Sequence, residues 1–397
     1  MKGEDNVQAR ERVLAALNHQ EPDRVPFDLG SCTGTNIAVR AYRALRAHLG
    51  LPDREVRLKS RTTQLAQVDE DLLQALSVDV RGVMPQPPSN YQAVLEEDDD
   101  YWKLRDEWGI GWRMPRVGGF YFDMYDHPLA HEYNVALDEY NWPNGKDPAR
   151  IAGLREQAIA HREAGYLVCF GGTIGNGFLH TGTHLEGFVD FFTDLALGTP
   201  RAEGILDRVL EIKLDFWGQV LDNLGDVVDV VCEQDDLGSQ RGPFISPDMY
   251  RKYIKPRQQI LFDFIKKKAP VKLYFHSCGS VYQFIPDLIE VGVDILNPVQ
   301  VSAAEMCTDR LKKEFGRELV FWGGGVDTQE ILPYGTPQQV KDEVKRRIDD
   351  LAPGGGFVFT TVHNIQADVP PANVMAMWEA LQEHGVAVTA VAIYGGT

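Results

Sequence analysis

Residues 271–296, VKLYFHSCGSVYQFIPDLIEVGVDIL, predict a strand, a helix and a second strand in succession. The apolar runs at 271–275 and 293–296 are strand-like, and 281–290 has helical spacing between them. Such a unit is typical of α/β folds, in which the carboxyl ends of parallel strands meet at one edge and carry the residues that bind ligands. The residues that directly follow each strand are therefore the candidate site.

The same alternation extends on both sides of this stretch. Further strands are predicted at 25–30, 76–83, 166–170, 227–232, 319–322 and 357–360. Helices are predicted at 6–19, 36–49, 148–164, 184–224, 247–268, 303–315, 336–351 and 371–385. Eight apolar strands, each followed by a helix or an insertion, predict an α/β fold of the (β/α)8 TIM-barrel type with an N-terminal helical extension. An open doubly wound sheet is the alternative, although no G-x-G-x-x-G motif follows the first strand.

Residues 85–147 interrupt this alternation and predict a small β-rich insertion in a single barrel domain at 1–397. The segment is rich in proline and aromatic residues, with Trp102, Trp108 and Trp112 in short alternating runs. We expect the insertion to cover the mouth of the site. Its aromatic side chains form either a hydrophobic cover or a surface for a flat substrate or a partner's cofactor.

The composition excludes several classes of function. The chain has 397 residues and a formal net charge of −18, which repels phosphate backbones and anionic membranes. We therefore expect no nucleic-acid or membrane partner and a small-molecule substrate. The five cysteines are scattered and odd in number, so they predict reduced thiols rather than a disulfide framework. The charged N-terminal segment has no signal-like apolar stretch, which favours a cytoplasmic location.

The pair His276 and Cys278 is the sharpest chemical signal. Residues two apart in an extended chain face the same side, so an imidazole and a thiol so placed can bind one zinc ion. A hydrogen-bonded histidine beside an inert cysteine is the alternative. The further ligand candidates are His363, Gln300, Glu233, Asp235, Asp236 and Cys32. Cys307 is expected in a helix with a structural role.

Polar residues after the other strands are candidates for acid–base chemistry and substrate binding. The catalytic candidates are Asp236, His363 and Asp28, as proton donors or orienters of the substrate. Asp236 lies on one loop with Glu233 and Asp235, where neighbouring carboxylates raise one another's pKa. The substrate-binding candidates are Glu233, Gln300, Asn297, Asp327 and Gln366. Asp327 has the alternative role of a helix cap. His180 and His184 lack the glutamate of an H-E-x-x-H motif and are expected to line the mouth or to pack.

Several motifs resemble the uroporphyrinogen decarboxylase (URO-D) family, in the expected order over nearly the whole chain. They are ALNHQEPDRVPFDLG (16–30), ISPDMYRKYIKPRQ (245–258), FHSCGSV (275–281), DILNPVQ (294–300), FWGGGVDTQEILPYGTPQQVKDEV (321–344) and PGGGFVFTTVHNIQADVPPANV (353–374). The resemblance implies the barrel fold. It also implies one of two activities, and a homodimer as a family-level expectation.

One branch of the family decarboxylates uroporphyrinogen without a cofactor, and the other comprises zinc methyltransferases that work with a corrinoid protein. In the second branch, an H-x-C after strand five and a Cys after strand eight hold zinc. His276 and Cys278 match the first two positions, His363 stands at the third, and Gln300 stands where a related methionine synthase has a glutamate. The arginine-rich motif of the decarboxylases is absent, because LGSCTG (29–34) follows the first strand.

The resemblance and the residues together favour a methyltransferase of the second branch. It would move a methyl group between a small molecule or a thiol and a cobalamin-type corrinoid protein, with Zn²⁺ on His276, Cys278 and His363 as Lewis acid. A cofactor-independent decarboxylase acting on a carboxylated substrate is the alternative. A non-catalytic protein that binds a corrinoid or tetrapyrrole is a third hypothesis.

Overall fold

Seven parallel strands form the central sheet of the protein, in a computed structural model that describes residues 7–386. The strands are β3 (Val80–Val83), β8 (Leu167–Phe170), β9 (Val230–Gln234), β10 (Lys272–His276), β11 (Ile295–Asn297), β12 (Val320–Trp322) and β13 (Phe357–Val358). They lie side by side in chain order, each parallel to its neighbour. The sheet is therefore the predicted parallel barrel sheet. The residues 1–6 and 387–397 of the predicted domain lie outside the described range.

Residues 26–28 connect the two edges of this sheet. The backbone N–H of Phe359 donates to the carbonyl of Pro26 at 2.8 Å. The backbone N–H of Asp28 donates to the carbonyl of Phe359 at 2.9 Å. On the other side, the backbone N–H of Asp79 donates to the carbonyl of Phe27 at 2.9 Å. The strand predicted at 25–30 is thus shortened to a parallel bridge at Phe27, but it occupies the eighth position of a TIM-barrel-like ring.

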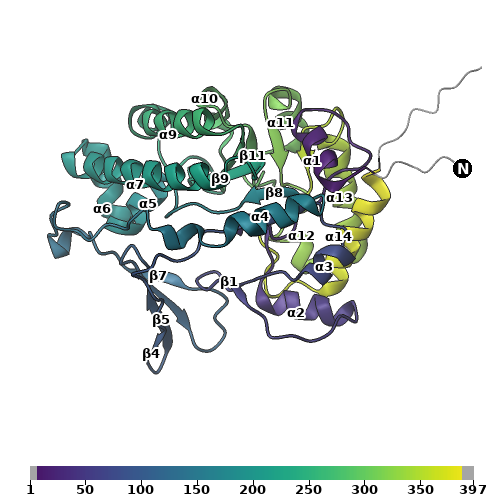
Figure 1. Ribbon diagram of the computed structural model, residues 1–397, viewed down its shortest axis with the longest axis horizontal. Coiled ribbons are helices and arrows are strands. Elements are labelled where there is room, and N and C mark those ends of the chain that lie inside the picture. Colours follow the sequence, from purple (N-terminus) through teal and green to yellow (C-terminus); the bar gives the residue numbers. More distant parts are fainter. Residues whose placement is uncertain (1–6, 387–397) are drawn as a thin grey trace, which may run out of the picture.

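Helices surround the sheet on the outside (Figure 1). Those that follow its strands are α4 (Leu154–Glu163), α5 (Phe178–Glu186), α6 (Phe188–Leu197), α7 (Pro200–Leu224), α8 (Pro247–Met249), α9 (Lys255–Lys268), α10 (Ile285–Glu290), α11 (Thr308–Phe315), α12 (Ile331–Tyr334), α13 (Pro337–Leu351) and α14 (Pro371–His384). A π-helical turn at Tyr250–Ile254 joins α8 to α9. The helices predicted at 336–351 and 371–385 are confirmed almost to the residue. The helix predicted at 303–315 begins only at Thr308, because 303–307 form turns.

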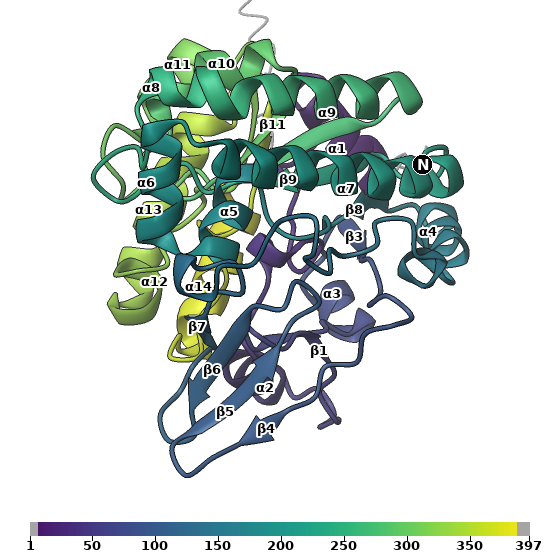
Figure 2. The same cartoon turned by 90° about the vertical axis from the view of Figure 1, so that its left-hand side faces the viewer.

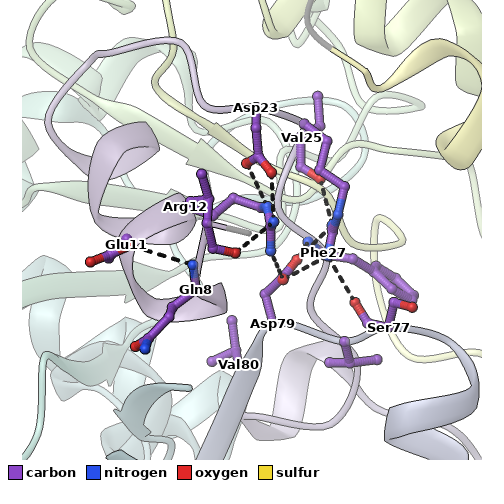
Figure 3. Close-up of polar contacts among 12 residues, drawn as sticks. Gln8, Glu11, Arg12, Asp23, Val25, Phe27, Ser77, Asp79 and Val80 are labelled. Atoms are coloured by element: carbon purple, nitrogen blue, oxygen red, sulfur yellow. Dashed lines mark hydrogen bonds and ion pairs between the residues drawn. The ribbon is translucent and has the colours of Figure 1, made fainter. Parts of the chain in front are cut away.

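Helix α1 (Ala9–Leu17) closes the amino-terminal end of the barrel. Its Val13 and Leu17 pack with interior side chains such as Val80 and Leu167, which begin their strands. A buried ion cluster holds this helix in place (Figure 3): Asp79 is paired with Arg12 at 2.8 Å and with Arg24 at 2.7 Å. Because α1 covers this end of the barrel, the opposite end, at the carboxyl ends of the strands, is the one left for ligands.

The predicted β-rich insertion is a four-stranded antiparallel sheet. Its strands are β4 (Glu96–Glu97), β5 (Tyr101–Arg105), β6 (Gly111–Pro115) and β7 (Asp123–Asp126). In two views related by a quarter turn it projects away from α9 and α10 (Figure 1, Figure 2). The hairpin β1 (Leu58–Ser60) and β2 (Leu65–Ala66) and the helices α2 (Val39–His48) and α3 (Glu70–Ala75) precede it.

None of the helices within 7–386 combines the length and apolarity that a membrane crossing requires.

Candidate active site

His276, Cys278 and His363 converge at the carboxyl ends of the strands. His276 ends β10, Cys278 follows two residues later, and His363 lies after β13. The Sγ atom of Cys278 is 3.3 Å from Nε2 of His276, and one potential ligand atom from each of the three residues lies within 4.8 Å of the others. Strand alternation alone predicts that 276 and 278 share a side, whereas His363 joins them only through the closed ring of strands.

Asn297 fixes the orientation of the His276 ring. Its Oδ1 lies 2.5 Å from Nδ1 of His276, and its Nδ2 donates to the carbonyl of Trp322 at 2.6 Å. Because Nδ2 is engaged as a donor, Oδ1 is the acceptor for the Nδ1 proton, and the other ring nitrogen, Nε2, faces Cys278. Gly34 packs against the same ring, where a Cβ atom would lie 2.8 Å from Nδ1. The imidazole is therefore held from two sides.

Asp236 connects the metal-binding candidates with His180. Its Oδ1 accepts the N–H of Cys278 at 2.9 Å and lies 4.0 Å from Nε2 of His276, while its Oδ2 is 3.7 Å from Nδ1 of His180. Burial opposes its ionisation, but the His180 and His276 imidazoles lower the pKa of Asp236 below its usual value. The ionised Asp236 carboxylate therefore favours a positively charged group, such as a metal cation, among the side chains of the cavity.

Burial also changes the protonation of the other two residues. It lowers the pKa of His363 to about 4, with a further contribution from His276, so His363 is neutral at physiological pH. Burial and the Asp236 carboxylate raise the pKa of the Cys278 thiol well above its usual value. A cation at this position would reverse that shift, because a coordinated thiol loses its proton.

The residues present fit a zinc ion. Neutral imidazole and thiolate are the ligands that zinc prefers, and three protein ligands leave an open position of the kind that catalytic sites use. Tetrahedral geometry with ordinary Zn–N and Zn–S bonds places the two donor atoms about 3.5 Å apart. The observed Nε2···Sγ separation is 3.3 Å. The hydrogen bond from His276 to Asn297 is the outer contact that metal-bound histidines usually make.

A cavity of about 260 Å³ contains this group. It is lined by Thr33, Gly34, Ser60, Thr62, Thr63, Asn176, His180, Gln234, Asp236, His276, Cys278, His363 and Asn364. A second cavity, of about 490 Å³, shares Thr62, Thr63, Asn176 and His180 with it. Trp108, Ile110, Trp112, Phe122 and Met124 of the insertion contribute its apolar wall. The insertion thus supplies aromatic side chains to the cavity beside the site, whereas its covering of the mouth stays a prediction.

Asp28 lies inside the barrel and does not line either of these cavities. It is fully buried, accepts the Ser31 hydroxyl at 2.7 Å and accepts the indole N–H of Trp322 at 3.0 Å. Burial raises the pKa of Asp28 to about 6. Asp28 is therefore a buried, hydrogen-bonded side chain, and a substrate in either cavity would not contact it directly.

Glu233 does not line the cavity that contains His276, Cys278 and His363, although it lines an adjoining cavity of about 200 Å³ beside His276. The sequence suggested a loop at 233–236, but β9 continues to Gln234, so Glu233 is a strand residue. Its carboxylate pairs with Lys213 at 2.8 Å and accepts the indole N–H of Trp217 at 2.6 Å; both residues belong to α7. Alternation along β9 directs Glu233 outward and Gln234 inward, so Gln234 lines the cavity in its place.

Gln300, Gln366 and Asp327 lie outside the residues that line the cavity. The Oε1 of Gln300 accepts the N–H of Gly279 at 2.6 Å, which supports the turn after Cys278. Gln366 donates to the carbonyl of Asn364 at 3.3 Å. Asp327 accepts the N–H of Glu330 at 2.9 Å, in agreement with the alternative role of a cap.

The other four cysteines do not line the cavity that contains Cys278, although Cys32 and Cys232 line the adjoining cavity beside His276. Cys32 contacts the Tyr274 hydroxyl at 3.3 Å in the barrel interior. Cys169 and Cys232 lie there as well, with their sulfur atoms 3.4 Å apart. Cys307 is exposed and precedes α11 as its N-cap instead of lying within the helix.

Sequence reasoning left the role of His180 open and missed several polar residues of the cavity. Asp235 accepts backbone N–H groups of Phe178, Leu179 and His180 at 2.9–3.0 Å, which fixes the start of α5 and directs His180 to the cavity. Ser60, Thr62 and Thr63 come from the β1–β2 hairpin, and Asn176 from the loop before α5. None of these residues follows a strand of the barrel sheet immediately, so the strand–helix pattern of the sequence does not mark them as site residues.

Comparisons with known proteins bear on the family and the fold of this chain. The sequence model of the family described as Uroporphyrinogen decarboxylase (URO-D) matches residues 179–384. A protein named uroporphyrinogen decarboxylase from Pseudoalteromonas translucida is 26% identical over 180 residues, which cover 41% of this chain and 47% of that protein. The chain therefore matches about half the length of this relative.

A solved structure described as a methyltransferase from Methanosarcina mazei has the same fold. It superposes with a TM-score of 0.62 over 95% of this chain and 99% of that chain, at 18% sequence identity.

Proposed function

Because this chain belongs to the uroporphyrinogen decarboxylase family, we propose that it is a zinc-dependent methyltransferase that moves a methyl group between a small molecule or a thiol and a corrinoid protein. The observation that carries the proposal is the convergence of Nε2 of His276, Sγ of Cys278 and the His363 imidazole in one cavity. Zinc bound there supplies Lewis acidity, which lowers the pKa of a thiol or polarises a methyl-bearing oxygen.

The residues around this group have separate tasks in the proposal. Asn297 keeps the His276 ring in the orientation that offers Nε2. Asp236 holds the backbone of Cys278 and orients the substrate together with His180. The aromatic cavity that adjoins the site receives the body of the methyl-bearing molecule, and its walls exclude water from the reacting atoms.

The charge of the two cavities argues against a polycarboxylate substrate. In the described part of the chain, no lysine or arginine lines either cavity, whereas Asp106, Glu107 and Asp236 do. Carboxylates without a cationic partner would be bound poorly, since a charge-assisted pair is the usual means of holding them. The lining therefore favours the transferase over decarboxylation of uroporphyrinogen.

The corrinoid protein, a homodimeric assembly and a cytoplasmic location belong to the same proposal. Five free cysteines fit a reducing compartment. A corrinoid protein must approach the mouth of the barrel, which the insertion flanks, because methyl transfer requires the cobalt to reach the substrate in the cavity.

Metal content and methyl transfer test the proposal. We expect the purified protein to contain zinc. The Cys278→Ala variant should contain about one zinc ion less per chain, and it should no longer methylate cob(I)alamin. Cys307→Ala is the matched control, because it removes an exposed thiol outside the cavity. Zinc-free protein with full activity, or release of carbon dioxide from a carboxylated substrate, would contradict the methyltransferase.

A further inference from the structure

A second group of ligand-type side chains lies outside the candidate active site. It consists of His131, Glu186 and Asp194, whose potential ligand atoms lie within 4.8 Å of one another. His131 begins a short 3-10 turn after the insertion, Glu186 ends α5, and Asp194 lies in the last turn of α6. The three residues therefore come from three separate elements.

The His131 ring is oriented toward the two carboxylates. Its Nε2 lies 3.1 Å from Oδ2 of Asp194 and 3.5 Å from Oε1 of Glu186. On the other side, Asp190 accepts the backbone N–H of His131 at 3.0 Å and has Oδ1 3.8 Å from its Nδ1. The contacts with Asp190 fix the backbone and the ring, so that Nε2 is directed into the group.

The two buried carboxylates have Arg201 and His131 as their ion-pair partners among the described residues. The side chains of Glu186 and Asp194 are 0% and 9% exposed, and both lie near helix carboxyl termini, where the backbone dipole is also negative. Arg201 binds Oε1 of Glu186 at 2.5 Å, but its NH1 and NH2 groups donate to backbone carbonyls. Among the described residues, Oε2 of Glu186 has no hydrogen-bond partner.

An unpartnered carboxylate oxygen in this position is costly. Burial of a charged oxygen without a partner is unfavourable, so such groups are usually paired or coordinate a metal. Tetrahedral zinc would place a nitrogen and an oxygen ligand about 3.4 Å apart, close to the two observed separations of 3.1 and 3.5 Å. Imidazole together with carboxylates favours a borderline ion such as Zn²⁺ over calcium, which prefers an all-oxygen shell.

We propose that His131, Glu186 and Asp194 form a second divalent-metal site that binds Zn²⁺ and holds the end of the insertion against α5 and α6. The half-exposed His131 side chain leaves the ion accessible to solvent, so water completes its coordination. The site shares no residue with the group of His276. It affects that group indirectly, because α5 also carries His180 and His184, which line the aromatic cavity.

Zinc binding in the Cys278→Ala background isolates this site. We expect protein stripped with a chelator to take up about one Zn²⁺ per chain and to unfold at a higher temperature after zinc is added. His131→Gln removes a proposed ligand, so the affinity for zinc should fall by more than the roughly 10–100-fold that follows the loss of a residue hydrogen-bonded to a metal ligand. The increase in unfolding temperature on zinc addition should disappear as well. Asp194→Asn provides a second variant, and His48→Gln, at an exposed position of α2, is the control.

The outcomes separate this site from the proposed active site. Zinc lost in His131→Gln but retained in Cys278→Ala supports the second site even if the methyltransferase proposal fails. Equal zinc content and an equal thermal shift in the Cys278→Ala protein with and without His131→Gln would overturn the second site. In that case a protonated His131 paired with Asp194 explains the geometry without a metal.

Discussion

Oδ1 of Asn297 lies 2.5 Å from Nδ1 of His276, and this contact decides which nitrogen of the histidine faces Cys278. The two residues end neighbouring strands, β11 and β10, at paired positions of the parallel register. The strand pairing that builds the barrel therefore also sets the tautomer at the site. An imidazole without this partner would be free to present either nitrogen.

Removal of the Asn297 amide is expected to weaken zinc binding. Asn297→Ala leaves Nδ1 of His276 without its acceptor, so the affinity for zinc should fall about 10–100-fold, as for other outer partners of metal-bound histidines. Competition with a chromogenic chelator measures the affinity. Asn297→Asp keeps an acceptor for Nδ1 and should recover most of it. An unchanged affinity in Asn297→Ala would show that this contact does not orient the ligand.

Gly34→Ala is expected to displace the His276 ring. The added methyl group would lie 2.8 Å from Nδ1 of His276 and 3.2 Å from Oδ1 of Asn297, so the ring or the loop must shift. We expect weaker zinc binding and a stability loss of about 1–3 kcal/mol, as for other overpacked sites. Gly242→Ala is the control, because nothing lies within 4 Å of a Cβ there. Chemical denaturation and zinc titration of both variants give the comparison.

Asp28 is expected to make stability fall as the pH rises. Its folded-state pKa is about 6, above the usual 3.8, so the folded protein holds a proton that the unfolded chain loses between these values. The stabilisation is fully present below about pH 4 and is lost as the pH rises through 6, on the order of 3 kcal/mol in total.

Asp28→Asn tests this linkage because it keeps the side-chain shape without the titration. The free energy of unfolding of the variant, relative to the original protein, should increase between pH 4 and pH 6.5 and level off above. Urea denaturation at each pH supplies the values. A difference that stays constant over this range would mean that Asp28 does not change its protonation there.

Loss of Asp79 is expected to destabilise the amino-terminal end of the barrel. Asp79 is buried between Arg12 and Arg24. It accepts the N–H of Phe27 at 2.9 Å, and Figure 3 shows it beside Arg12 and Phe27. Asp79→Ala leaves the buried Arg12 guanidinium with Asp23 as its remaining carboxylate partner, so we expect a loss of about 3 kcal/mol, at the lower end of the range for broken buried pairs.

The control for Asp79 is Asp226→Ala, which removes an exposed pair with Arg155 at 2.6 Å. Exposed pairs contribute little, because water and salt screen them. Thermal and urea denaturation of both variants measure the difference. Similar losses of unfolding free energy in the two variants would show that the buried Asp79 cluster stabilises the protein no more than an exposed ion pair does.

The sequence alone determined the strand–helix alternation and the pairing of His276 with Cys278. Both depend on local periodicity, since apolar runs mark buried strands and residues two apart in an extended chain share a side. For this reason α13 and α14 have nearly their predicted bounds. The antiparallel insertion followed equally from short alternating runs between glycines.

Only the tertiary structure decided which polar residues after the strands share one cavity. The sequence grouped Glu233 with Asp235 and Asp236. In the structure Glu233 pairs with Lys213 of α7, Asp235 accepts an N–H group at the start of α5, and Asp236 lies beside His276. His131, Glu186 and Asp194 also become neighbours only through the packing of α5 and α6 against the end of the insertion. Local patterns contain no information on such contacts, because they join segments distant in the chain by strand closure and helix packing.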